Sequence, residues 1–87
     1  MFNLSGLNIA KVLDDKDPNG RERFFGKVVG LHDMNSSDDT GIWIENGMSD
    51  FYTSGNVPPI GTYVYVMFQQ NDINKAVYFG QVKYNIE

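Results

Sequence analysis

Alternating side chains between Thr62 and Phe68 constrain the fold of this chain more than any other feature. Val64, Val66 and Phe68 form one set, and Tyr63, Tyr65 and Met67 form the other. This period of two is the pattern of a β-strand. The polar residues 70–74 favour a turn and separate this strand from a second β-rich run at 76–80. The region predicts a β-hairpin in which the valine set is buried and the tyrosine set faces outward.

Three more segments have the composition of β-strands, and polar or turn-forming stretches separate them. The strands are predicted at Leu7–Leu13, Arg23–Val29 and Ile42–Glu45. The connection 31–41 is rich in Ser, Asn and Asp, so we expect it to be a mobile polar loop. Residues 48–55 have room for a short helix or an irregular crossover before the hairpin.

Two glycines indicate that the five predicted strands form a barrel. Gly26 shares the predicted inner face of its strand with Phe24 and Val28, and a strand without a side chain there can coil sharply. Gly80 lies where the apolar alternation of the last strand changes phase, which predicts a β-bulge. The sequence therefore predicts an all-β chain that forms a five-stranded Greek-key OB-fold barrel.

The length of 87 residues and the hydrophobic content of 41% favour a single domain. We expect residues 1–6 to be a flexible N-terminal arm and residues 7–87 to form the OB-fold domain. The N-terminal residues lack the basic start and apolar core of a signal peptide, and we expect no membrane span. The chain has no cysteine, which fits a reducing compartment.

Residues that could support catalysis or metal binding are few. His32 lies beside Asp33 and could act as a base or ligand, but a histidine in this position more often caps or packs at a loop. Asp14, Asp15 and Asp17, like the Asp38–Asp39 pair, lack the ligand spacing of a calcium loop, so we interpret them as solvated turn carboxylates. We expect no enzymatic activity, no catalytic residue, no cofactor and no metal.

Outward aromatic side chains on an OB-fold first suggest single-stranded nucleic-acid binding, in which bases stack on the aromatics. The candidates are Phe25, Trp43, Tyr63, Tyr65 and Tyr78. The formal net charge of -4 opposes contact with a phosphate backbone. We therefore keep nucleic-acid binding as the alternative function.

The other explanation is a protein interface, because interface cores are enriched in aromatic residues and methionine. The predicted interface residues are Phe25, Val29, Tyr63, Tyr65 and Met67. A competing interpretation is that the N-terminal arm or residues 48–52 cover some of them. Exposed rows of large apolar side chains are unfavourable in a free monomer, so the sequence favours the interface.

Several motifs, taken in order, resemble one known family. Residues 17–33 resemble the opening Asp-Pro, glycine, then Arg-Val-x-Val-x-Val-x-Gly-x-His of the N-terminal OB domain in central spike proteins of contractile-tailed phages, a domain that also occurs in VgrG-type spike proteins. Residues 56–68 and 77–80 are similar to that family's Pro-x-x-Gly-x-x-Val-x-Val-x-Phe hairpin and its terminal strand ending in glycine. Ile42-Trp43 lies where the family often has Pro-Trp.

This resemblance implies a structural role in a tail baseplate or a related contractile injection machine. Its implied partners are the baseplate hub protein and a spike, needle or tip protein, with three copies around the tail axis. The implied location is the virion, after synthesis in the host cytoplasm. One departure is that Phe24, Phe25 and Gly26 stand in place of the usual Val-x-Val. The resemblance covers residues 7–84 and therefore implies nothing about membrane piercing or cell-wall cleavage.

Overall fold

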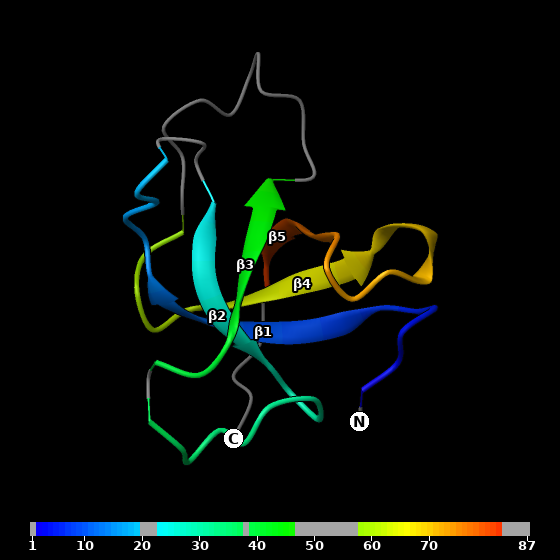
Figure 1. Ribbon diagram of the computed structural model, residues 1–87, viewed down its shortest axis with the longest axis horizontal. Helices are drawn as coiled ribbons and strands as arrows, with labels where there is room; N and C mark the ends of the chain where they lie inside the picture. Colours follow the sequence, from blue (N-terminus) through cyan, green and yellow to red (C-terminus); the bar gives the residue numbers. More distant parts are fainter. Residues whose placement is uncertain (1, 20–22, 38, 47–57, 83–87) are drawn as a thin grey trace.

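The computed structural model describes residues 2–19, 23–37, 39–46 and 58–82, and within them five β-strands close into a barrel (Figure 1). The elements are β1 (Asn8–Asp14), β2 (Phe24–Val28), β3 (Ile42–Asn46), β4 (Tyr63–Phe68), the short 3-10 helix η1 (Gln69–Asn71) and β5 (Ala76–Gln81). The strand order is β1-β2-β3-β5-β4, and β4 pairs back onto β1. Only the β3–β5 pair is parallel among these five. This architecture confirms the predicted OB-fold barrel.

The predicted hairpin lies at the centre of the fold, where β4 pairs with β1 on one side and β5 on the other. Val64 and Val66 are fully buried and Phe68 nearly so, which confirms the inward side of β4. Tyr63 and Tyr65 are partly exposed and Met67 is exposed, as expected for the opposite side. The interior is one cluster made by all five strands: Ala10, Val12, Phe24, Val28, Ile44, Val64, Val66, Phe68, Ala76 and Tyr78.

Gly26 has the role that the sequence assigned to it, and the structure gives the physical reason. A Cβ atom at this position would lie 2.4 Å from the backbone oxygen of Lys11 and 2.7 Å from the Phe24 ring. Only glycine therefore permits β1 and β2 to approach this closely where the sheet coils. Immediately beyond, the register between the two strands shifts, so that Leu13 is the extra residue of a bulge.

A second bulge confirms the phase change predicted at Gly80. Tyr65 pairs with Gly80 whereas Val66 pairs with Tyr78, which leaves Phe79 as the additional residue of β5. Phe79 is exposed, and Tyr78 turns into the core beside Phe24, with the two ring centroids 5.0 Å apart. The prediction that Tyr78 is an outward aromatic is therefore wrong, because Tyr78 pairs with the buried Val66 and shares its inward side.

The N-terminal segment, predicted to be a flexible arm, lies against the barrel. Phe2 and Leu4 pack against the core cluster, and the Phe2 ring meets Phe68 edge-on with centroids 5.5 Å apart. The Asn8 side chain fixes the turn between Asn3 and Asn8. Its Oδ1 accepts the backbone N–H of Asn3, and its Nδ2 donates to the backbone oxygen of Asn3, each at 2.6 Å. These contacts extend the packed unit to Phe2.

Some predicted features lie outside the described residues. These are the helix or crossover at 48–55 and the end of the domain after residue 82. Within the described part, no helix has the length and apolar character needed to cross a membrane.

Candidate functional site

The outward residues of β4 join those of its neighbours in a continuous row. Tyr65 pairs with Ile9 of β1. On the other side of β1, the backbone N–H of Val29 donates to the backbone oxygen of Ile9 at 2.8 Å. Leu7 immediately precedes Asn8, whose partner is Val66, and Met67 immediately follows Val66. Four of the predicted interface residues, Val29, Tyr63, Tyr65 and Met67, therefore belong to one side of the barrel.

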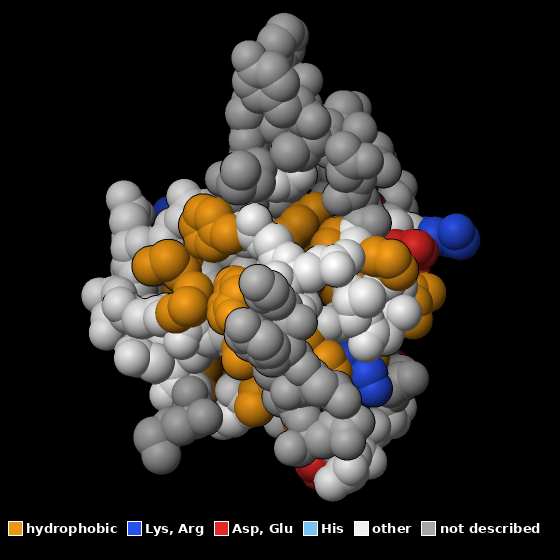
Figure 2. Space-filling model, turned by 180° about the vertical axis from the view of Figure 1, so that it is seen from behind, with side chains coloured by type: hydrophobic (Ala, Val, Ile, Leu, Met, Phe, Trp, Pro, Cys, Tyr) orange, Lys and Arg blue, Asp and Glu red, His pale blue; other side chains and the backbone are white. Residues whose placement is uncertain are grey.

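Large apolar side chains on this side are exposed. Leu7, Met67 and Phe79 expose 57%, 39% and 43% of their surface. We call this surface the apolar face; it consists of Leu7, Ile9, Val29, Tyr63, Tyr65, Met67 and Phe79. Figure 2, which views the molecule from behind Figure 1, shows hydrophobic side chains spread from the left of the view through its centre to its right. Leu7, Ile9 and Phe79 were not in the sequence prediction, because their position depends on strand register and on the bulge.

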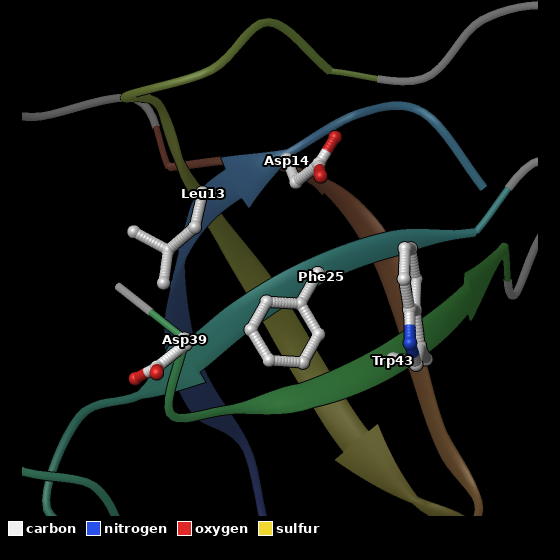
Figure 3. A pocket seen from close by; sticks show the side chains of 5 residues that line it. All are labelled: Leu13, Asp14, Phe25, Asp39 and Trp43. Carbon is white, nitrogen blue, oxygen red and sulfur yellow. The ribbon is translucent and has the colours of Figure 1, made fainter. Parts of the chain in front are cut away.

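Phe25, the fifth predicted interface residue, lies elsewhere. Its strand partners are Trp43 of β3 and Asp14 of β1, not the residues of β4. It forms the floor of a shallow groove of about 520 Å³ that we call the acidic groove, lined by Leu13, Asp14, Phe25, Asp39 and Trp43. Figure 3 shows the Phe25 ring between Asp39 and Trp43, with Leu13 and Asp14 along one edge. The structure thus divides the predicted interface into two surfaces.

An ion pair supports one wall of the acidic groove. The Arg23 guanidinium lies over the Trp43 ring, 5.2 Å from its centroid. Its Nε donates to Asp17 Oδ2 at 2.8 Å and its Nη2 to Asp17 Oδ1 at 2.9 Å. These bonds to Asp17 raise the pKa of Arg23 above its ordinary value, although burial alone would lower it.

The Asp17 carboxylate corrects one sequence interpretation. Only 2% of the Asp17 side chain is exposed, so it is not a solvated turn carboxylate. Its Oδ1 also accepts the N–H of Asn19, and the ion pair ties the loop after β1 to the start of β2. Among the described residues, no three His, Cys, Asp or Glu side chains gather as a metal site.

Lys27 alternates with the inward residues Gly26 and Val28 on β2, yet the structure shows that its side chain is covered. Only 1% of Lys27 is exposed, because the loop after β2 folds back over it. Its Nζ donates to the backbone oxygen of Ser36 at 2.7 Å and to Ser36 Oγ at 3.0 Å. Ser36 Oγ in turn donates to the oxygen of Asp33 at 2.7 Å. The polar loop is therefore anchored to the barrel in this structure.

His32 closes the end of β2. Its ring Nδ1 accepts a hydrogen bond from the backbone N–H of Val28 at 2.9 Å. The backbone N–H of His32 donates to the backbone oxygen of Val28, also at 2.9 Å. Burial, assisted by the positive charge of Lys27, lowers the pKa of His32. This geometry confirms the interpretation of His32 as a residue that caps and packs at a loop.

The aromatic residues considered for base stacking do not form one platform. Phe25 and Trp43 meet at a centroid distance of 5.3 Å, Tyr63 and Tyr65 lie on β4, and Tyr78 is inside the core. A scan against models of protein families finds no match to this chain, and a search of curated proteins also finds no match.

Proposed function

We propose that the chain is a non-enzymatic structural adaptor of a phage tail baseplate or a related contractile injection machine. In this role the OB-fold barrel contacts a hub protein and a spike or tip protein, and three copies assemble around the tail axis. The proposal combines the resemblance of the sequence motifs with the properties of the barrel surface.

The apolar face carries this proposal. Leu7, Met67 and Phe79 are exposed on a small barrel, and Tyr65 lies in the row between β1 and β5. Contiguous exposed apolar side chains are unfavourable in water and are common in protein interfaces. The strands beneath form a closed barrel, so the face is presented on a rigid support.

A charge placed in the apolar face tests the proposal. Tyr65→Asp adds a carboxylate to the middle row, where it would be desolvated on contact with a partner. Because the Tyr65 side chain is partly exposed, we expect the barrel to fold and the chain to be missing from assembled particles. Asn74→Asp is the matched control, since it adds a charge at the exposed β4–β5 connection.

The readout is the amount of chain in purified particles, with circular dichroism to verify folding. Normal incorporation of Tyr65→Asp would contradict the proposal, as would equal loss of the Asn74→Asp variant. Tyr65→Phe, which keeps the ring, is expected to assemble.

Single-stranded nucleic-acid binding is the second candidate, and one observation favours it. Phe25 and Trp43 lie on β2 and β3, the strands whose face binds oligonucleotides in OB-folds. Against it, Asp14 and Asp39 line the same groove and would repel phosphates. A gel shift with a single-stranded oligonucleotide at low salt, weakening steeply as salt rises, would support this second function.

A further inference from the structure

The acidic groove is a surface separate from the apolar face. Its residues come from the end of β1, from β2, from β3 and from the loop that leads into β3. Figure 3 shows the Phe25 ring face-on, between Trp43 and Asp39. The groove therefore joins an accessible aromatic ring with two carboxylates.

The aromatic part of the groove is fixed before any ligand arrives. Trp43 contacts Phe25 at a centroid distance of 5.3 Å with an interplanar angle of 61°. The Arg23 guanidinium supports the Trp43 ring, and the nearly buried Asp17 carboxylate holds that guanidinium by two hydrogen bonds. A preorganised surface binds with a smaller loss of conformational entropy.

Two carboxylates, those of Asp14 and Asp39, give the groove its negative charge. Asp14 and Asp39 are exposed, and within the described part of the chain neither forms an ion pair with a lysine or arginine. Asp14 Oδ1 accepts the N–H of Lys16 at 2.9 Å, and Asp39 Oδ1 accepts the hydroxyl of Ser37 at 2.5 Å. The faces of aromatic rings carry negative electrostatic potential as well. Cations are thus attracted to the groove, and phosphates are repelled.

We propose that the acidic groove binds an arginine side chain from a basic segment of a partner protein. A guanidinium can stack on the Phe25 ring while its N–H groups donate to Asp14 or Asp39. A lysine ammonium can approach the carboxylates, but it cannot stack as a plane. The Arg23–Trp43 contact already shows this type of pairing at the edge of the groove.

The proposal does not rest on the baseplate role, because it uses none of the residues of the apolar face. It adds a second partner surface to the barrel, selected by charge. A chain with Tyr65→Asp should keep full arginine binding, so failure of one proposal can be distinguished from failure of the other.

Trp43 provides the assay, since it is the single tryptophan of the chain. The probe is the peptide acetyl-Gly-Arg-Gly-Arg-Gly-amide, titrated at low salt while the fluorescence of Trp43 is recorded. We expect a saturable change in fluorescence whose apparent affinity falls as salt rises. The affinity should be lower for the peptide with lysine in place of arginine, and the peptide with glutamate should cause no change. The double variant Asp14→Asn with Asp39→Asn should weaken binding about tenfold.

A matched double variant, Asp33→Asn with Asp72→Asn, changes the net charge equally at residues that do not line the groove. We expect it to weaken binding much less than the groove variant does, because neither of its carboxylates lines the groove or can accept a hydrogen bond from a guanidinium bound there. Absence of a saturable change with the arginine peptide would overturn the proposal, and so would equal weakening in both double variants. A saturable change in Trp43 fluorescence with a single-stranded oligonucleotide in place of the peptide would also overturn it, in favour of nucleic-acid binding.

Discussion

Asp17 and Arg23 form a two-bond ion pair that ties the loop after β1 to the start of β2, with N–O distances of 2.8 and 2.9 Å. The side chains of Asp17 and Arg23 are both largely buried. Removing the Asp17 carboxylate therefore leaves a mostly buried positive charge without its partner. We predict that Asp17→Ala lowers the free energy of unfolding by about 2 kcal/mol. Urea unfolding followed by circular dichroism measures this. Asp15→Ala, which removes a weak 3.9 Å pair with the exposed Lys16, should change it by less than about 0.5 kcal/mol; equal effects would contradict the prediction.

The His32 cap predicts a dependence of stability on pH. The pKa of His32 is lowered in the folded chain, so the unfolded chain binds the proton more readily. The contribution of His32 is therefore complete above the unfolded pKa of about 6.5 and is lost as pH falls through the lower folded pKa. Protonation of Nδ1 would break its bond to the N–H of Val28. Urea midpoints at a series of pH values should show a larger loss below neutrality in the natural chain than in His32→Asn; parallel curves would contradict this account.

The buried Lys27 predicts a local effect on the loop that covers it. Lys27→Met keeps an unbranched side chain of similar length but removes the two hydrogen bonds to Ser36. Replacing a buried charge by an apolar group is often nearly neutral, so we expect a change in global stability of less than about 1 kcal/mol. Hydrogen exchange of residues 33–37 should become faster. Unchanged exchange there would show that Lys27 does not anchor the loop.

Phe2 tests whether the N-terminal segment belongs to the folded unit. Its ring packs edge-on against Phe68, which the segment helps to bury. Phe2→Ala should lower the free energy of unfolding by about 1–2 kcal/mol, from lost ring contact and apolar burial. Asn3→Ala is unsuitable as a control because Asn3 bonds to Asn8, whereas Ser5→Ala removes only an exposed hydroxyl and its 3.2 Å hydrogen bond to Asn3 Oδ1. No difference between Phe2→Ala and Ser5→Ala in thermal unfolding would support a loose arm.

The sequence predicts the barrel well because its strongest signals are local. Alternation in β4 identifies which residues face inward, and glycines identify where the strands coil or bulge. The chemistry of the surfaces is predicted less well, because it depends on distant partners. Lys27 is buried by Ser36 of a following loop, and Phe25 meets Trp43 only through the register between β2 and β3. Alternation places both Phe25 and Tyr65 on the outside of the barrel, but it cannot show that they belong to two different surfaces.

The position of Tyr78 shows a second limit. Tyr78 precedes the bulge at Phe79, and it faces inward because it pairs with the buried Val66, just as Ala76 pairs with Phe68. Only the residues after Phe79 change side through the bulge. The phase change at Gly80 is visible in the sequence, but the extra residue could be placed at Phe79 only from the pairing with β4.

Native mass spectrometry of the chain, alone and mixed with the hub and tip proteins of candidate tail machines, tests the central claim most directly. The claim is that the apolar face is occupied by another protein in the assembled state. We predict a complex that contains the hub protein and three copies of this chain, and no such complex with Tyr65→Asp. A chain that stays monomeric with every tail component, yet binds a single-stranded oligonucleotide at low salt, would contradict the account.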